Sequence, residues 1–540
     1  MRRMIMLLCF LAVSLDYISA QNDIDEKAIA RFLACDIEEI SDEEFERLSE
    51  YLLKQMKVNL MSHSELVASG LFTRFQAASV SDYKKRYGQI LSLMELASLD
   101  GFNEDIAESI APFISFEYIP DYAGRVAHEV TTRLSTRISE ENVRLGYASR
   151  YKMSYGDAMN ISLAVSRSLS SAEIKPDALC GSIESRFKRI PMRIVLGDFN
   201  ARFAQGLAIW SGVNFSSLNS PSAFLKRASG FTPSASFTGT GTLKGAAVEY
   251  VNSNISLSAG VAPSAGTIFN YTRLWRHGQV GITHNKSTSI DVSACIEGVD
   301  LFTEVAYSWS DANIAYVLGT IFPVGDYWDF AAMLRGTTDE YDFSMSGSFQ
   351  KMKCVNGTFS ADLALYETPK VDTQDRSLQL KLHSQWTLTL TETLNLIIRG
   401  TERLRSWGVK NRTDIRTDLV WNYRSLYASC RLNVLTCRNA SFLSYVEGGI
   451  KTEKSSLYLR QGAFIVDHWD DRIYAYERDA PGCFNSPAFY GRGVWTSFMA
   501  SFQFSRWCKL YLRAGYTSYL FMKENKPGKA ELRFQSVFDF

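Results

Sequence analysis

The chain ends on residues 532–540, LRFQSVFDF, and this stretch decides the fold class. Every second residue falls on one face, which carries Leu532, Phe534, Phe538 and the final residue Phe540. Apolar side chains at alternate positions predict a β-strand with one buried or lipid-facing side. A soluble domain seldom finishes on such a strand, because chain ends fray. The stretch therefore favours a strand that is held in place up to its last residue.

The same alternation runs backwards through the chain to about Gly124. Residues 378–390, 415–424 and 254–262 each place apolar side chains on one face and polar ones on the other. Such segments number roughly 20 to 26 and are separated by turns rich in Gly, Asn, Asp and Ser; about nine to eleven residues suffice for a tilted strand to cross a bilayer. Residues 125–540 are therefore predicted to form a large antiparallel transmembrane β-barrel. Stacked β-sandwiches and a propeller are the soluble alternatives, but no blade repeat or sandwich-sized unit is visible.

The start of the chain is typical of an export signal. Arg2 and Arg3 precede an apolar core at 4–15, and 18–20 offer a cleavage site, so residues 1–20 are predicted to be a signal peptide. No later stretch reaches the roughly 18 apolar residues of a membrane helix. A membrane-spanning form of this chain must therefore be a barrel. We expect it in the bacterial outer membrane, in contact with its lipid, with the amino-terminal domain in the periplasm.

Residues before the barrel carry a helical rather than a strand period. A helical lead-in is predicted over 21–56, where Ser41 with Glu44 forms a capping-box pattern. A second helical unit is predicted over 57–115. It consists of a short helix, a glycine break and a longer helix, and this order then repeats. The whole chain is thus expected to be of the α+β multidomain class, with an all-α amino-terminal part followed by the barrel.

The repeated unit resembles a tandem helix-hairpin-helix domain of the competence-protein (ComEA-like) type. The matching motifs are Val58-Asn59-Leu60, Glu65-Leu66, the link Tyr83–Arg86–Gly88, and the turn Leu99-Asp100-Gly101-Phe102. In that family the hairpin turns present backbone N–H groups to a DNA phosphate, using the anion site at a helix N-terminus. The resemblance implies a possible DNA- or phosphate-binding set. Its members are Gly70, Leu71, Gly101 and Phe102; the charge pattern adds the basic cluster Lys84, Lys85 and Arg86, for which a solvated helix face is the alternative.

Charge separates the two parts of the chain. Residues 22–113 hold 18 acidic against 9 basic residues, a net charge of −9, whereas 114–540 have a net charge of +8. Nucleic-acid affinity depends largely on Lys and Arg neutralising phosphates. The acidic balance favours a structural or docking role for the helical domain, with a periplasmic protein as a possible partner. DNA binding or uptake across the outer membrane is the alternative.

A further motif lies near the start of the predicted barrel. Residues 193–212, followed by Gly230-Phe231 and Lys244-Gly245, look like a family of exported Bacteroidetes proteins that carry a helix-hairpin-helix domain. Polar residues stand here beside apolar strand positions, and they predict a lumen network or the anchor of an inward-folded segment. A binding site is the alternative. These residues are Asp198, Asn200, Arg202 and Gln205.

Motifs for catalysis are scarce. None of the six histidines stands in a zinc pattern, and neither a nucleophile elbow nor a phosphate-binding glycine loop is present, so no cofactor or metal is predicted. The polar run 467–472, which contains His468, is predicted to be a loop, with a surface hydrolase as a distant alternative. Cys430 and Cys437 could meet across a hairpin. The sequence predicts a non-enzymatic outer-membrane barrel protein acting in docking, assembly or transport.

Overall fold

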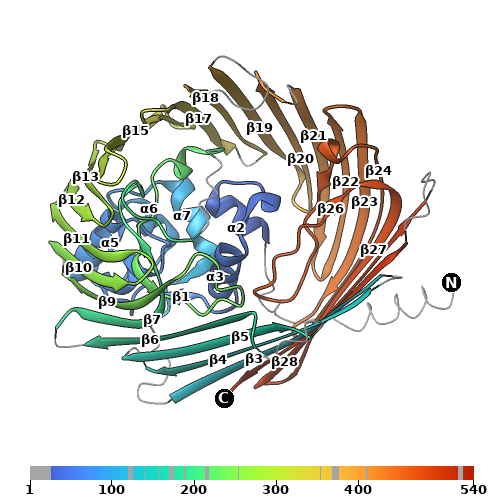
Figure 1. The fold of residues 1–540 in the computed structure, drawn as a ribbon, viewed down its shortest axis with the longest axis horizontal. Helices are drawn as coiled ribbons and strands as arrows, with labels where there is room; N and C mark the ends of the chain where they lie inside the picture. The colour runs from blue at the N-terminus through green and yellow to red at the C-terminus, as the bar shows by residue number, and fades with distance from the viewer. Residues whose placement is uncertain are drawn as a thin grey trace.

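The molecule, described here from a computed structural model, consists of a ring of strands that encloses a helical region (Figure 1). The predicted signal peptide, residues 1–20, lies outside the described residues. The structure describes residues 26–118, 126–139, 142–156, 158–169, 175–187, 190–212, 218–252, 254–275, 277–352, 354–367, 376–408, 411–520 and 527–540.

The helical region comes first in the chain. Its elements are α2 (Glu26–Leu33), η1 (Ile37–Glu39), α3 (Asp42–Leu53), β1 (Met56–Lys57), α4 (His63–Ala68), α5 (Arg74–Tyr87), α6 (Leu93–Ala97), α7 (Glu104–Ile110), η2 (Ala111–Phe113) and β2 (Ile114–Ser115). The short strands β1 and β2 pair in parallel. The start of the second half of the helical region and its last residues therefore lie side by side. No helix among the described residues is both long and apolar enough to cross a bilayer.

The ring of strands occupies the rest of the chain. Its elements are β3 (Val126–Ser139), β4 (Asn142–Tyr155), β5 (Met159–Ser168), β6 (Ala178–Phe187), β7 (Met192–Arg202), β8 (Gly230–Pro233), β9 (Leu243–Val251), β10 (Ile255–Ala262), β11 (Gly266–Trp275), β12 (Gly278–His284), β13 (Ser287–Ile296), β14 (Val299–Ser308), β15 (Asn313–Val324), β16 (Trp328–Gly336), β17 (Glu340–Met352), β18 (Val355–Tyr366), β19 (Ser377–Thr391), β20 (Leu394–Arg405), β21 (Asn411–Tyr423), β22 (Leu426–Thr436), β23 (Ala440–Lys451), β24 (Ser455–Val466), β27 (Gly491–Ser505), β28 (Cys508–Tyr519) and β29 (Lys529–Asp539). The connections between ring strands contain η3 (Pro221–Ala223), η4 (Trp469–Asp471), β25 (Ile473–Tyr474) and β26 (Ala488–Phe489).

The ring is a closed antiparallel barrel. Every strand pairs with its neighbours along the chain, and β29 closes against β3 (Figure 1). The short strand β8 pairs with the end of β7, while β7 also pairs directly with β9, so the described residues form a ring of 24 strands with β8 on its inner side. The predicted large antiparallel barrel is confirmed, and 24 lies within the predicted range. A closed ring of this kind excludes the sandwich and propeller alternatives.

Side chains alternate between lumen and exterior along each strand. In β24, Tyr458, Arg460 and Phe464 are buried inside, whereas Leu457 and Ile465 face outwards and are 43% and 47% exposed. Exposed leucine, isoleucine, valine and aromatic side chains recur on the outer face of strands around the ring. An outward apolar band with a polar interior is the pattern of a barrel embedded in lipid.

The two rims of the barrel differ in loop length. On the rim where β3 begins and β29 ends, connections such as 424–425 and 452–454 are short turns. The opposite rim carries the long connections 203–242 and 467–490. Outer-membrane barrels have short periplasmic turns and longer extracellular loops. We therefore refer to a short-turn, periplasmic rim and a long-loop, extracellular rim.

The helical region has a core of its own. Phe32, Phe45, Leu48, Phe72 and Phe113 are almost fully buried, because the apolar faces of the helices pack on one another. The units α4–α5 and α6–α7 each contain a short helix, a glycine in the left-handed region and a second helix, with φ of +65° at Gly70 and +83° at Gly101. Two helix–turn–helix units are thus present. Their assignment to the helix-hairpin-helix family is not confirmed.

The position of the helical region departs from the prediction. It lies within the ring of strands, close to β9–β13, and not as a separate periplasmic body (Figure 1). The helical period shows which faces are apolar, but it does not show that the acidic faces have partners elsewhere in the chain. We refer to residues 26–116 as the plug.

Two smaller predictions also need correction. Ser41 accepts a hydrogen bond from the Glu44 amide, but the Glu44 carboxylate is turned to Arg47 and Arg202, so only half of the capping box forms. Cys430 lies in β22 and Cys437 directly follows that strand, so the two cannot face each other across a hairpin.

Candidate functional site: the plugged lumen

Acidic side chains of the plug meet arginines of the inner wall at one main cluster. Glu38 accepts hydrogen bonds from Arg416 at 3.0 Å and from Arg431 at 2.7 Å, and an oxygen of Asp36 lies 2.8 Å from Arg399. Alternate residues of β20, β21 and β22 face the lumen, and Arg399 stands directly opposite Arg416 in the strand register. These three buried arginines and two largely covered carboxylates form what we call the arginine cluster.

Electrostatics keep the carboxylates of the cluster ionised. Burial alone would raise the pKa of Glu38, but Arg416, Arg431 and Arg399 outweigh it and lower the pKa to about 2. The pKa of Asp36 is likewise well below its usual range, because Arg399 outweighs the effect of burial. Removing one partner from a buried ion pair costs roughly 3–5 kcal/mol, since the other charge is left uncompensated. The cluster is therefore a strong but specific contact between plug and wall.

Helix α3 makes a second set of polar contacts with another sector of the wall. The pairs are Arg202 with Glu44, Asn200 with Glu43, Arg150 with Glu46, and Lys152 with Glu50. Burial raises the pKa of Glu44, but Arg202 and Arg47 outweigh it and bring the pKa to about 2. The acidic start of α3 is thus matched by basic and amide side chains on β4 and β7.

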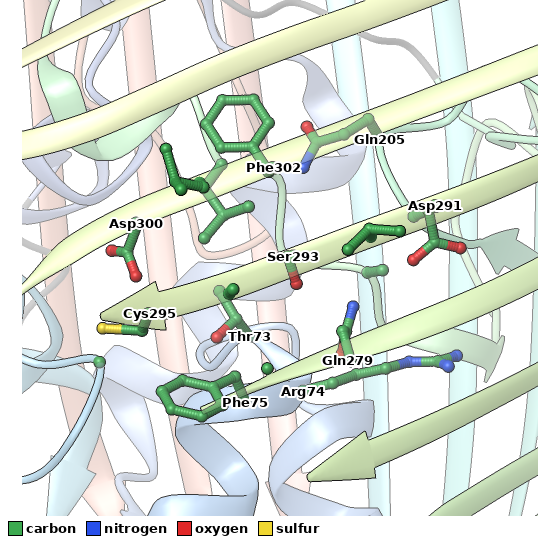
Figure 2. A pocket seen from close by; sticks show the side chains of 18 of the residues that line it. Thr73, Arg74, Phe75, Gln205, Gln279, Asp291, Ser293, Cys295, Asp300 and Phe302 are labelled. Carbon is green, nitrogen blue, oxygen red and sulfur yellow. The ribbon is translucent and has the colours of Figure 1, made fainter. Parts of the chain in front are cut away.

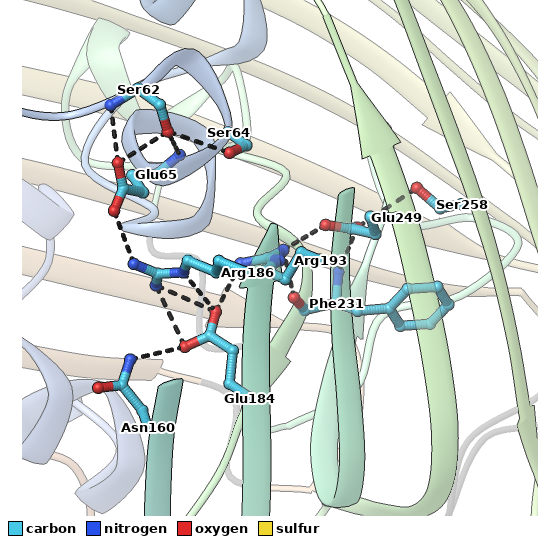
Figure 3. A network of polar contacts seen from close by, with 10 residues as sticks. All are labelled: Ser62, Ser64, Glu65, Asn160, Glu184, Arg186, Arg193, Phe231, Glu249 and Ser258. Atoms are coloured by element: carbon cyan, nitrogen blue, oxygen red, sulfur yellow. Dashed lines mark hydrogen bonds and ion pairs between the residues drawn. The ribbon is translucent and has the colours of Figure 1, made fainter. Parts of the chain in front are cut away.

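A third contact lies near the short-turn rim (Figure 3). The Glu65 carboxylate, at the capping box of α4, lies 2.7 Å from Arg186 at the end of β6. Arg186 also pairs with Glu184 at 3.0 Å, and Glu184 lies 3.5 Å from Arg193. Arg193 in turn pairs with Glu249 on β9. A chain of alternating charges thus leads from the plug across three neighbouring wall strands.

The described parts of the long connection, 203–212 and 218–242, fold back into the lumen. Strand β7 turns inwards at Gly197, whose φ is +95° and where an added Cβ would lie only 2.1 Å from the carbonyl oxygen of Gly181. Glycine is therefore required at this bend. Farther along, the Arg227 guanidinium lies 4.3 Å from the ring centre of Phe32 in the plug.

The second long connection, 467–490, also enters the lumen and covers the plug. The rings of Tyr476 and Phe484 lie 5.8 and 5.5 Å from that of Phe45. Arg478 bridges the plug and the wall, with Glu26 and Glu447 each 2.9 Å away. Both inward loops start from the long-loop rim, so the plug is held from that side as well as by the wall.

All four residues predicted to form a lumen network are buried. Asn200 and Arg202 contact the plug through Glu43 and Glu44, as described above. The other two bind groups of the wall. The Asp198 carboxylate accepts a hydrogen bond from the backbone N–H of Gly181 at 2.8 Å, and the backbone N–H of Gln205 donates to the Glu304 carboxylate at 2.8 Å. The structure therefore brings Asn200 and Arg202 together at the plug and places Asp198 and Gln205 elsewhere along the wall.

The two glycine turns predicted to contact phosphate are covered. Leu71 is fully buried, and Arg74, in the first turn of α5, donates to Asn270 at 3.1 Å and Thr272 at 2.5 Å on β11. At the second turn, Asn103 caps α7 and donates to Asp329 on β16 at 3.2 Å. Both helix N-termini therefore face the barrel wall.

Other members of the predicted phosphate-binding set make contacts within the plug. The carbonyl oxygen of Gly101 accepts from Gln76 at 2.8 Å, and the Phe102 ring lies 6.1 Å from Phe72. An added Cβ at Gly70 would lie 2.7 Å from the Arg47 guanidinium.

The basic run of α5 is only partly exposed. Lys84 donates to the carbonyl oxygens of Val58 at 2.9 Å and Met61 at 2.7 Å, so it closes the plug internally. Arg86 is exposed and pairs with Asp82 at 2.9 Å, while Lys85 is exposed. DNA binding by these residues stays a prediction.

A small cavity of about 40 Å³ marks the seam between plug and wall (Figure 2). The start of α5, with Arg74, forms one side, and Gln279 and Asp291 of β12 and β13 form the other. Among the described residues, Gln279 Oε1 and Asp291 Oδ1 have no hydrogen-bond partner. Since one water takes up roughly 30 Å³, this is a space for a single solvent molecule rather than for a solute.

A larger cavity of about 470 Å³ separates the plug from the wall strands β15–β24. Asp329, Asn356 and Asn395, which line it, are each the second residue of a strand that begins at the short-turn rim. Its other end is lined by Arg416 and Arg431 of the arginine cluster. The cavity therefore extends from the periplasmic rim to the arginine cluster, and we call it the vestibule.

The polar run considered for hydrolysis lies on the long-loop rim. Asp467 pairs with Arg492 at 2.8 Å, and Asp471 accepts from the backbone amides of Arg438 and Asn439. Asp467 and Asp471 are thus bound by groups other than His468, so among the described residues neither forms the Asp–His pair that a hydrolase would need. Within the described part of the chain, no group of three or more His, Cys, Asp or Glu side chains is arranged to hold a metal ion.

Sequence reasoning did not single out the wall arginines. Arg399, Arg416 and Arg431 each stand among polar residues on the inward face of an alternating strand. The net charges of −9 and +8 in the two parts of the chain were the available signal. Opposite net charges of this size are consistent with two complementary surfaces, and they could have been used to predict contact between plug and wall.

Comparison with known proteins gives only distant likenesses. No protein-family model and no curated protein matches the chain. Among solved structures, the siderophore receptor PirA from Acinetobacter baumannii is similar at 8% identity, over 78% of this chain and 81% of that one, with a TM-score of 0.44. The siderophore receptor PirA from Pseudomonas aeruginosa is similar at 10% identity, with the same coverage of both chains and a TM-score of 0.42. OccK5 (OpdH) from the same organism is similar at 6% identity, over 77% of this chain and 98% of that one, with a TM-score of 0.33. Values this low assign neither a family nor a solute.

The class of protein follows from the chain's own geometry. A closed ring of 24 antiparallel strands, apolar outside and polar inside, is an outer-membrane β-barrel.

Proposed function

We propose that this protein is a gated channel of the outer membrane, without enzymatic activity, whose lumen is closed by the plug. The observation that carries the proposal is the arginine cluster, where buried plug carboxylates meet wall arginines. A ring of more than about 20 strands has a lumen too wide for wall side chains to fill, and barrels of that size carry a plug. The plug and the two inward loops supply the missing volume.

The chemistry of the plug–wall contact suits a plug that can move. An apolar seam would expose a large hydrophobic surface on opening, whereas charged and polar side chains can be hydrated once separated. The arginine cluster stands at the inner end of the vestibule. Separation of Asp36 and Glu38 from the wall would extend the vestibule towards the long-loop rim. The cluster would then act as the gate.

Conductance of the full-length protein in planar bilayers tests the proposal. The wild type should be closed for most of the time, and the double variant Asp36→Asn/Glu38→Gln should open frequently because the arginines lose their counter-charges. Glu108→Gln is the matched control, since Glu108 pairs with Arg31 at an exposed site. A double variant whose plug becomes protease-sensitive but which conducts no more than the control would contradict the proposal. So would a wild type that is as open as the double variant.

Docking of a periplasmic protein and DNA uptake through helix-hairpin-helix turns are the finer alternatives. Both would use the surface of the plug that faces the short-turn rim, and DNA would require Lys84, Lys85 and Arg86. The contacts of Arg74 and Asn103 with the wall count against phosphate binding in the closed state. Salt-sensitive DNA binding by the full-length protein, abolished when Lys85 and Arg86 become glutamine, would favour uptake. No binding at low salt would exclude it.

A further inference from the structure

The vestibule offers no net charge to a solute. Its lining holds five carboxylates and five cationic side chains. The arginines among them are already paired: Arg31, Arg416, Arg431 and Arg460 each have a carboxylate oxygen within 3.0 Å. Of the lining carboxylates, Asp105 lies beside Asp329, and burial and this neighbour raise the pKa of Asp105 to about 7, so it is partly protonated near neutral pH. A charged solute would therefore lose water here without finding a fully charged free partner, which is costly in a confined site. The vestibule therefore disfavours ions.

Neutral hydrogen-bonding groups dominate the rest of the lining. They include Ser348, Thr358, Gln385, Thr387, Asn395 and Asn422, which come from neighbouring wall strands. Hydroxyl and carboxamide groups both donate and accept hydrogen bonds. The register places Thr358 opposite both Ser348 and Gln385, so three of these side chains form a continuous polar row across β17, β18 and β19. Such a row matches the closely spaced hydroxyl groups of a sugar.

Among the described residues, the buried side chains of the vestibule with unmet hydrogen-bonding capacity include His383. His383 is only 5% exposed, and neither ring nitrogen has a hydrogen-bond partner among the described residues. The nearest carboxylate oxygen of Asp36 lies 3.8 Å from its Nε2 atom. Buried polar groups without a protein partner are uncommon, so the ring nitrogens of His383 are available to a hydrogen-bonding solute. His383 stands on the same strand face as Gln385, beside the polar row.

Size and apolar surface fit the same class of solute. The volume of about 470 Å³ lies in the range of small-molecule sites. Tyr427 lines the vestibule as well and offers a flat apolar face to ring C–H groups. We propose that the vestibule binds an uncharged polyhydroxylated solute of mono- or disaccharide size. This inference rests on the proposed channel function and deepens it.

Calorimetric titration of the plugged full-length protein in a sugar-free detergent tests this inference. Glucose and trehalose should bind, whereas glutamate and lysine should not. His383→Ala and Gln385→Ala should each weaken sugar binding about three- to tenfold, the effect of one lost hydrogen bond. Gln461→Ala is the matched control, because Gln461 lies on the outer face of β24, and it should leave binding unchanged.

The outcomes separate this inference from the channel proposal. Absence of sugar binding, preference for a charged probe, or equal loss in Gln461→Ala would overturn the saccharide assignment even if conductance behaves as proposed. Sugar binding that weakens in His383→Ala and Gln385→Ala supports the assignment even in a protein that never opens, because the titration is made on the closed state.

Discussion

The two halves of the plug hold the barrel in different ways. The first half, 26–56, contacts the wall through carboxylates that face arginines, with Glu38 and Glu44 among them. The second half, 57–116, has one such ion pair, Glu65 with Arg186, and relies more on hydrogen bonds to neutral wall groups, such as those of Arg74 to Asn270 and Thr272. Residues 26–56, which the sequence suggests are only a helical lead-in, therefore provide the strongest attachment of the plug to the wall. The helix–turn–helix repeat, which carries the family resemblance, fills space beside it.

The largest effect is expected from Glu44→Gln in the first half. Glu44 lies between Arg202 and Arg47, and its loss leaves the buried Arg202 and the partly buried Arg47 without their main counter-charge. We expect the free energy that holds the plug in the barrel to fall by about 3 kcal/mol. The measurement is the rate at which protease cleaves the plug in the intact barrel. Glu108→Gln, at an exposed pair, should change it by less than about 1 kcal/mol; equal effects of the two variants would refute the comparison.

A pH effect is expected from Asp105 in the second half. Burial, and then the nearby Asp329 carboxylate and Glu108, raise the pKa of Asp105 to about 7, against the opposing effect of Arg31. A raised pKa means that docking is favoured when Asp105 is protonated, so plug attachment weakens as pH rises from about 4 towards 7. Glu38 and Glu44, with pKa values of about 2, do not titrate in this window.

Plug cleavage at pH 5 and pH 8 measures this effect. The wild-type plug should be cleaved faster at pH 8, and Asp105→Asn should remove most of the difference. A difference that persists unchanged in Asp105→Asn would assign the pH response to another group.

A smaller effect is expected from Arg74→Met. The change removes two hydrogen bonds to neutral acceptors, but it also removes a buried charge, so we expect a loss of about 1–2 kcal/mol in plug attachment. The same cleavage assay gives the value. A loss as large as that of Glu44→Gln would show that the two halves do not differ in kind.

The smallest effect concerns the glycine turns. Gly101 and Gly88 both have positive φ, but an added Cβ meets Phe75 at 2.8 Å only at Gly101, whereas none of the surrounding atoms lies within 4 Å at Gly88. Both alanine variants should carry a conformational cost of about 1 kcal/mol. Thermal unfolding of the plug should show an additional loss in Gly101→Ala. Identical unfolding of the two variants would argue against close packing at this turn.

Much of the fold could be predicted from the sequence. Period-2 alternation, as in 415–424, identified the barrel strands, and Gly70 and Gly101 marked the two turns that adopt positive φ. Periodicity fails at the next level, because it shows which face of a helix is apolar but not which distant surface meets its polar face. The location of the plug inside the ring was therefore missed.

The vestibule could not be predicted for a related reason. It exists because the plug lies closer to one side of the ring and because small polar residues such as Ser348 and Thr358 line the other. Each of these residues alone is an ordinary inward-facing strand position. Only the packing of two bodies creates the space between them.

Zero-length carbodiimide cross-linking of the full-length protein in membranes tests the central claim most directly. The Lys152 ammonium pairs with Glu50, and the Lys381 ammonium lies 3.6 Å from Glu39, so two opposed sectors of the wall, β4 and β19, each offer a lysine to the plug. If the plug lies inside the barrel, mass spectrometry should find both the Glu50–Lys152 and the Glu39–Lys381 cross-links, and Lys152→Arg should remove only the first. Cross-links confined to pairs within residues 26–116, with neither wall lysine joined, would contradict the account.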